Sequence, residues 1–335
     1  RKPGTGPLTA CGQPYRAGCG RANVGAMRHP HPLPAVLGSR FSVAAARDAG
    51  VPPGRLRRRD LETPFHGVRA ARRPVAVGDV NAAERQALEY LVRVRHYAPR
   101  LREGQFLSHE SAVALLGGPT PLIRVDGRVA DGLTLPVHVS TRGEGPLVRA
   151  EGVRAHRATT SSRMLRGDGI LLGHPATTWA QLGSWDVFDL VALGDYLCRV
   201  WRSGPGRPDP GRRPWTTIDE LRAEVASVRR RGAARLRSAL DLIREDAWSP
   251  RESMLRCRLV LAGLPEPALN HDAYDRHGRF LGCVDMAYPE LRIAVEYHGR
   301  MHHAQYAEDV ERIAGLRVPW IEGFSWDRDL SEVAA

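Results

Sequence analysis

Between residues 42 and 70 the hydrophobic positions form two short helical groups and then an extended segment. Ser42 is a good helix N-cap, VAAARDA at 43–49 has helical spacing, and Gly50 is a natural stop. After a VPPG turn, GRLRRRDL at 54–61 predicts a second short helix, and TPFHGVRA at 63–70 predicts a strand or wing. This order is the outline of a winged helix-turn-helix. We expect the basic run of the second helix to contact nucleic-acid phosphates, with a solvated helix surface as the alternative; the run comprises Arg55, Arg57, Arg58 and Arg59.

The next region alternates helical and strand-like patterns. Asn81 and Glu84 form a capping-box pattern for a helix at 82–98, and Ser108 precedes a second helix at 109–117. Alternation predicts strands at 136–141 and 152–158, and the spacing of Leu and Val over 179–201 predicts a further helical segment. We interpret the scattered histidines of this region as surface or hydrogen-bonded residues rather than ligands; they are His109, His138, His156 and His174.

A stretch rich in Pro and Gly, RSGPGRPDPGRRP at 202–214, predicts a linker. A long helical region at 217–243 follows, and then a helix with Ser249 as N-cap and a stop at Gly263. We therefore predict an α+β multi-domain protein, with a leader at 1–26, a winged helix-turn-helix at 27–75, a mixed α+β region at 76–201, a linker at 202–216 and an α/β domain at 217–335.

The net charge, the cysteines and the apolar content of the sequence indicate what kind of partner and location to expect. The formal net charge is +12 and the pI is about 10.2, which indicates an acidic polymer as partner, most simply nucleic acid. Lys2 is the only lysine, so nearly all of the basic residues are arginine. A GC-rich genome produces such a bias regardless of function, so it explains part of this charge. Five cysteines without a CxxC pair argue against a disulfide framework and a structural zinc site. The sequence contains no apolar run long enough to predict a membrane span, and we expect a cytoplasmic location. We also expect the leader before Met27 to be disordered.

The strongest chemical signal is VDMAYPELRIAVEYHGRMHH at 284–303. It predicts a hairpin with a two-residue turn, in which Asp285 lies directly opposite Glu296 and His298 shares their face. Ile293, Val295 and Tyr297 then point into a core on the other face.

Two facing carboxylates repel each other by about 3 kcal/mol at about 5 Å and an effective dielectric of about 20. A divalent cation relieves this repulsion, and hard carboxylate oxygens suit Mg²⁺, with Mn²⁺ as an alternative. Protonation of one carboxylate, or its pairing with an arginine, would relieve it as well. A metal here predicts activation of water and hydrolysis of a phosphodiester.

These residues resemble the PD-(D/E)XK nuclease core, and the pattern is most similar to the very-short-patch-repair endonuclease-like branch. SPRESMLRCRLVLAGLPEP resembles the leading helix of that family, HDAYDRHGRFLGCVD its first hairpin, DVERIAGL the following helix and PWIEGFSW the final strand. The resemblance implies a restriction-endonuclease-like C-terminal domain. FLSHESAVALLGG, PVHVST and GVRAHR resemble the AbiEi-type antitoxin arrangement, which implies a defence or toxin-antitoxin setting.

Carried over by position, the resemblance implies that Asp285 and Glu296 bind the metal, with support from Glu252 on the leading helix. His298 stands where many members carry lysine or aspartate, and it can act as a general base. His302 and His303 follow, and His302 is expected to reach phosphate or the leaving oxygen. Arg300 in the same stretch is expected to contact nucleic acid.

The leading hypothesis is a Mg²⁺-dependent DNA endonuclease or nickase. Two departures from the family pattern, His298 and Gly323, favour an alternative in which a degenerate nuclease fold serves a DNA-binding, antitoxin-like transcriptional regulator. A third hypothesis is action on RNA, because basic charge does not separate RNA from DNA.

Overall fold

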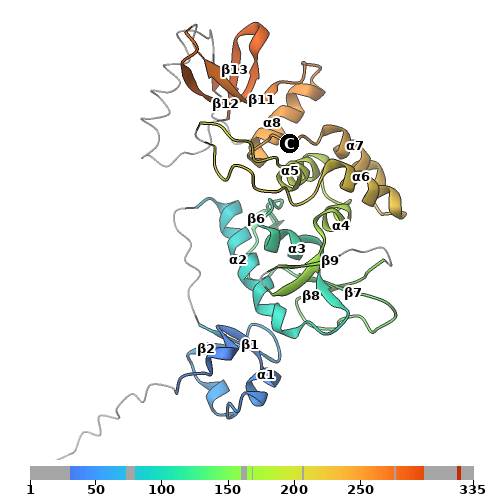
Figure 1. Ribbon diagram of the computed structural model, residues 1–335. Coiled ribbons are helices and arrows are strands. Elements are labelled where there is room, and N and C mark those ends of the chain that lie inside the picture. The colour runs from blue at the N-terminus through green and yellow to red at the C-terminus, as the bar shows by residue number, and fades with distance from the viewer. Residues whose placement is uncertain are drawn as a thin grey trace, which may run out of the picture.

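The computed structural model describes residues 31–72, 80–159, 164–167, 169–205, 207–274, 277–297 and, for the backbone, 323–325. The fold is mixed α+β, and the described strands form four separate sheets. Figure 1 shows the N-terminal strands in blue at one end, a green α+β middle region, and the orange strands near the C-terminus at the other end. The predicted leader lies outside the described residues.

The N-terminal unit is built from β1 (Arg40–Ser42), α1 (Val43–Asp48), β2 (Leu61–Glu62) and β3 (Val68–Ala71), with sheet order β1-β3-β2. Ser42 caps α1 as predicted, since its side chain accepts a hydrogen bond from the Ala45 amide. The second predicted helix is only the 3₁₀ turn η2 (Arg55–Arg57). It ends early because Arg58 adopts an extended backbone. A small core holds the unit together, comprising Leu37, Phe41, Ala46, Val51, Leu56 and Leu61.

The middle region begins with α2 (Ala82–Tyr97), whose predicted capping box between Asn81 and Glu84 is confirmed. Helix α3 (His109–Leu116) follows Ser108 as predicted. Both elements pack near a five-stranded sheet of order β8-β7-β4-β10-β9. Its strands are β4 (Gln105–Leu107), β7 (Val137–Thr141), β8 (Val153–Arg157), β9 (Met164–Gly167) and β10 (Ile170–Gly173); β5 (Arg124–Val125) and β6 (Arg128–Val129) pair separately.

Five helices follow in sequence: α4 (Pro175–Ala180), α5 (Val187–Cys198), α6 (Ile218–Ser227), α7 (Ala233–Leu242) and α8 (Pro250–Leu261). The segments predicted as continuous helix at 179–201 and 217–243 are each interrupted. Asp186 caps a new helix at α5 by accepting a hydrogen bond from the Phe188 amide (2.8 Å). These helices extend the hydrophobic core of the middle sheet.

The two interruptions pack against each other through glycines. Gly232 has φ +75°, and a Cβ built on it would lie 1.8 Å from the Gly183 carbonyl oxygen. A Cβ on Gly183 would lie 2.4 Å from the Arg231 carbonyl oxygen. The backbones therefore approach so closely that only glycine fits at either position. This tertiary contact explains why the long helical pattern breaks between α6 and α7.

The segment predicted as a linker does not interrupt the core. One cluster of buried residues runs from Phe65 through Trp179 to Leu221 and Cys257, on both sides of 202–216. Within the segment, Arg207 makes a two-bond ion pair with Asp272 (2.9 and 3.0 Å) and also donates to the Asn270 carbonyl oxygen (2.8 Å). The core thus extends across the expected boundary, and Arg207 joins the segment to the C-terminal strands.

The C-terminal sheet has the order β11-β12-β13-β14. Its strands are β11 (Ala268–Tyr274), β12 (Phe280–Tyr288), β13 (Ile293–Glu296) and β14 (Gly323–Ser325). Strands β11, β12 and β13 pair antiparallel in chain order, and β14 pairs parallel to β13. Ser249 caps α8 ahead of this sheet as predicted. Helix, first hairpin, second hairpin and final strand therefore follow in the predicted order, whereas the helix predicted at 309–316 lies outside the described residues.

Candidate functional site

The predicted register of the β12–β13 hairpin is confirmed. Met286 pairs with Val295, and Tyr288 pairs with Ile293. Continuing this register by one residue places Asp285 opposite Glu296. The turn differs from the expected two residues: Pro289–Leu291 form a 3₁₀ turn, and Arg292 adopts a left-handed backbone with φ 56°. The longer loop keeps the register because Tyr288 and Ile293 still close it.

The Asp285 side chain lies across the end of β13. Its Oδ2 accepts a hydrogen bond from the Tyr297 amide at 2.8 Å. Asp285 and Glu296 are both half-buried. The residue that donates to Asp285 is the immediate neighbour of Glu296, so the structure brings the two predicted metal ligands to one end of the hairpin.

The predicted division of the hairpin into a polar and a core face is wrong in detail. Ile293 and Val295 were expected in the core, but both are only half-buried, whereas Ala294 between them is 8% exposed. On β12, Met286 and Ala287 are both fully buried, although they point to opposite faces. Both faces of the hairpin are therefore partly covered, since core residues occur on each. His298, Arg300 and His302, which complete the predicted site, lie outside the described residues.

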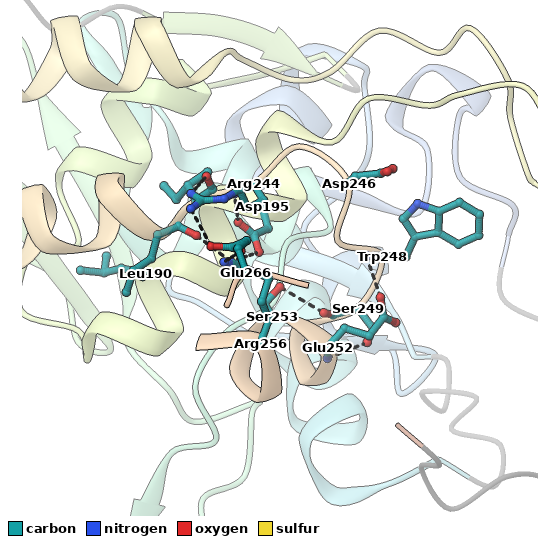
Figure 2. A network of polar contacts seen from close by, with 12 residues as sticks. Leu190, Asp195, Arg244, Asp246, Trp248, Ser249, Glu252, Ser253, Arg256 and Glu266 are labelled. Carbon is teal, nitrogen blue, oxygen red and sulfur yellow. Dashed lines mark hydrogen bonds and ion pairs between the residues drawn. The ribbon is translucent and has the colours of Figure 1, made fainter. Parts of the chain in front are cut away.

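Glu252 has a structural role at the start of α8. Its carboxylate accepts a hydrogen bond from the Trp248 amide (3.0 Å), and its own amide donates to the Ser249 hydroxyl (3.2 Å), as Figure 2 shows. Burial raises the pKa of Glu252, and the hydrogen bonds from Ser249 and Trp248 oppose this shift. These contacts satisfy amides that a helix N-terminus leaves unpaired. The role of Glu252 as a metal ligand stays a prediction.

The predicted basic run divides into two kinds of residue. Arg55 is bound to both oxygens of Asp60 (3.0 and 2.7 Å) and to the His31 carbonyl oxygen (2.7 Å). It therefore fastens the η2 turn and is not presented to a ligand. Arg57, Arg58 and Arg59 are exposed. They are the members of the run that can reach a phosphate backbone.

A second basic feature lies between the N-terminal unit and the middle sheet. A hollow of about 860 Å³ is lined there by Arg40 of β1, by Arg95 of α2 and by Arg102, together with Gln105 and Ile170. Three arginines against one acidic residue, Glu103, give the hollow a net positive lining, which suits a polyanion.

The structure also brings together three of the histidines that we interpreted as scattered. His109 begins α3, His138 lies on β7, and His156 lies on β8, and one potential ligand atom from each lies within 4.8 Å of the others. His138 Nδ1 and His156 Nε2 share a hydrogen bond at 3.0 Å. The rings of His109 and His156 stack with centroids 3.8 Å apart. His174, the fourth, occupies the N-cap position before α4 and is not part of this group.

Burial keeps these imidazoles neutral at physiological pH. Desolvation lowers the pKa of His138 and of His156 to about 4, and that of His109 to about 2. The charges of Arg154 and of the neighbouring rings act in the same direction. A neutral imidazole has a lone pair available for a metal.

No motif or spacing in the sequence predicts this histidine group. His138 follows His109 by 29 positions and His156 follows His138 by 18, and the three come from a helix and two strands. The histidines come together because β7 pairs in parallel with β8, which places Ser140 beside His156 and His138 beside Arg154. That pairing joins segments that are distant in the sequence, so the spacing of histidines within either strand did not reveal it.

Comparisons with known proteins identify no family. No known protein family matches the sequence, and no solved structure matches it. Two uncharacterized proteins from two strains of Mycobacterium tuberculosis are each 37% identical over 90 residues, which is 27% of this chain. The match spans only 33% of each relative's own length. Among the described helices, none combines the length and the apolar character that crossing a membrane requires.

Proposed function

We propose that this protein is a Mg²⁺-dependent endonuclease or nickase that hydrolyses phosphodiester bonds in DNA. The observation that carries the proposal is the register of the β12–β13 hairpin, in which Met286 pairs with Val295; continued by one residue, this register sets Asp285 opposite Glu296. The order of α8, β11, β12, β13 and β14 supports it, because the resemblance to PD-(D/E)XK nucleases predicts this succession.

The donor set fits a hard cation. Asp285 and Glu296 offer carboxylate oxygens, which Mg²⁺ prefers together with waters and phosphate oxygens. When bound, the ion supplies a Lewis acid and lowers the pKa of a coordinated water. The Tyr297 amide fixes Asp285 Oδ2, so the second oxygen of that carboxylate is oriented by the strand rather than by a mobile loop. In this proposal His298 accepts a proton from the attacking water.

The N-terminal unit supplies the contacts that position DNA in this proposal. Exposed arginines at and after η2 provide sequence-independent attraction to phosphates, and the arginine-lined hollow between β1 and α2 lengthens the basic surface. Phosphate contacts of this kind determine register and affinity, while base recognition needs side chains in a groove. No base-reading residue is identified among the described residues, so the proposal names DNA without a sequence.

The direct test is nicking of supercoiled plasmid by the purified chain. With Mg²⁺ or Mn²⁺ we expect conversion to the open-circular or linear form, and with EDTA we expect none. RNA and single-stranded oligonucleotides, offered in competition, separate DNA from RNA as the substrate. Intact plasmid after incubation with either metal would contradict an active nuclease.

Charge reversal at η2 tests the DNA-binding role separately from cleavage. Arg57→Glu/Arg58→Glu should weaken binding to duplex DNA in EDTA and lower the slope of log K against log salt by about 2. Arg235→Glu/Arg237→Glu, at two exposed positions of α7, changes the net charge by the same amount and should leave the slope nearer to that of the wild type. Equal slopes for both variants, measured by fluorescence anisotropy at several salt concentrations, would remove η2 from the interface.

A DNA-binding regulator is the second candidate. The same exposed arginines support it, and it does not require a catalytic metal. It predicts salt-sensitive binding to DNA with no cleavage under any divalent cation. The plasmid and anisotropy experiments together therefore distinguish the two functions.

A further inference from the structure

The group formed by His109, His138 and His156 has the spacing of a metal site. Two nitrogen ligands on one tetrahedral zinc lie about 3.3 Å apart, because each Zn–N bond is about 2.0–2.1 Å. His138 Nδ1 and His156 Nε2 lie 3.0 Å apart, and the whole set of ligand atoms spans at most 4.8 Å. Replacing the shared hydrogen bond by a metal therefore requires the two nitrogens to separate by only a few tenths of an ångström.

A carboxylate stands beside the histidines. Glu110 Oε2 lies 3.1 Å from His138 Nδ1. This oxygen is buried and has no hydrogen bond of acceptable geometry, whereas Oε1 of the same carboxylate accepts one from Trp185 Nε1 (3.2 Å). A buried carboxylate oxygen without a hydrogen bond destabilises the folded state, and a cation bound by the histidines would offset this loss.

Buried hydroxyl groups hold the segments that carry the histidines. Ser140 donates to Ser108 (2.8 Å), and His109 Nδ1 lies 3.0 Å from the Ser108 hydroxyl. The Ser111 hydroxyl accepts a hydrogen bond from the His138 amide at 2.8 Å. An outer-shell hydrogen bond to a ring nitrogen, such as that between Ser108 and His109 Nδ1, fixes the orientation and tautomer of an imidazole ligand. The three histidines are carried by α3, β7 and β8 rather than by an exposed loop.

From this geometry we propose that His109, His138 and His156 bind a borderline divalent transition metal of the Zn²⁺ class, with Glu110 as a fourth ligand or as the outer-shell base of a bound water. Imidazole nitrogens suit Zn²⁺, Co²⁺ and Ni²⁺, whereas Mg²⁺ prefers oxygen. The site is separate from the Asp285–Glu296 hairpin in residues and in metal preference. Three histidines with one further position are also the donor set of hydrolytic zinc sites.

The test titrates Co²⁺ into the whole 335-residue chain after chelator treatment, in an Asp285→Asn/Glu296→Gln background that removes the hairpin carboxylates. Isothermal titration and the visible absorption of tetrahedral Co²⁺ report stoichiometry and geometry. We expect one Co²⁺ per chain, competition by Zn²⁺ and none by Mg²⁺ in moderate excess. His138→Gln/His156→Gln should lower the affinity at least tenfold. His66→Gln, an exposed histidine in the N-terminal unit, should leave it unchanged.

Circular dichroism establishes that the variants fold, and Glu110→Gln provides a milder change in the same site. If the histidine variants fail to fold, anomalous scattering at the zinc edge from crystals of the unmutated chain decides, with a peak expected among the three imidazoles. Less than half an equivalent of bound Co²⁺ in the starting background would overturn the proposal. Equal affinity in the His138→Gln/His156→Gln variant would overturn it too, and neither result bears on DNA cleavage.

Discussion

Arg256→Met should lower the free energy of unfolding by about 3–5 kcal/mol at neutral pH. Arg256 is fully buried on α8 and donates to the Leu242 carbonyl oxygen (2.6 Å). It also donates to Asp195 of α5 (3.2 Å) and to Glu266 (3.0 Å), which Figure 2 shows beside it. The variant leaves the Asp195 carboxylate buried beside one remaining backbone donor, the Arg244 amide (2.7 Å). Uncompensated burial of charge causes the loss.

The loss should depend on pH. Burial raises the pKa of Asp195 to about 6, and the positive charge of Arg256 opposes this shift. Without Arg256 the folded-state pKa rises further, so the folded variant binds a proton that its unfolded chain releases above about pH 4. The stability of the variant therefore falls as pH rises from about 4 toward the raised folded-state pKa of Asp195. The difference in stability between the variant and the wild type should be smaller at pH 5 than at pH 8.

Denaturant titration followed by circular dichroism measures both effects. Arg251→Met, exposed on the same helix, is the matched control and should change stability by less than about 0.5 kcal/mol. Arg256→Met/Asp195→Leu removes both charges and should recover part of the loss, because apolar replacement of a buried pair is often tolerated. If Arg256→Met is as stable as Arg251→Met, the ion pair between Arg256 and Asp195 does not stabilise the packing of α5 against α8.

Asp285→Asn should reduce plasmid nicking by about a hundredfold or more, since a metal ligand contributes several kcal/mol of transition-state stabilisation. The amide oxygen of asparagine can still accept the hydrogen bond from the Tyr297 amide, so the hairpin should remain intact. Glu296→Gln should have an effect of similar size. Both variants remove charge from the proposed ligand pair without removing volume.

Glu290→Gln is the control for this series, because Glu290 is exposed in the turn of the same hairpin. Initial rates of nicking at several Mg²⁺ concentrations separate weaker metal binding from slower chemistry. Partial recovery at high Mg²⁺ indicates a lost ligand, whereas unchanged rates in both carboxylate variants would remove the catalytic assignment.

Features set by local geometry were predictable from the sequence. The helix starts at Ser42, Asn81 and Ser249 follow from side chains that cap their own helices. The hairpin register followed because alternation along β12 and β13 allows few ways to pair them. The turn was predicted too short, and the register still held because the two central residues assumed for the turn lie inside the longer loop.

Features set by contacts between distant segments were not predictable in the same way. The break between α6 and α7 depends on Gly232 meeting Gly183, and the continuous core depends on helices on both sides of 202–216. The histidine group depends on β7 and β8 lying side by side. Arg55 was expected to meet phosphate because its partner Asp60 gave no signal in the sequence. In each case the decisive neighbour is set by tertiary structure.

The central claim is that the carboxylates of Asp285 and Glu296 together bind a divalent cation. Anomalous diffraction from crystals soaked in Mn²⁺ tests it most directly, because Mn²⁺ replaces Mg²⁺ at oxygen sites and scatters strongly enough to locate. We predict a peak with carboxylate oxygens of both residues at bonding distance, absent in crystals of Glu296→Gln. A map with no peak at the hairpin, or with the two carboxylates turned to opposite faces of the sheet, would contradict the account.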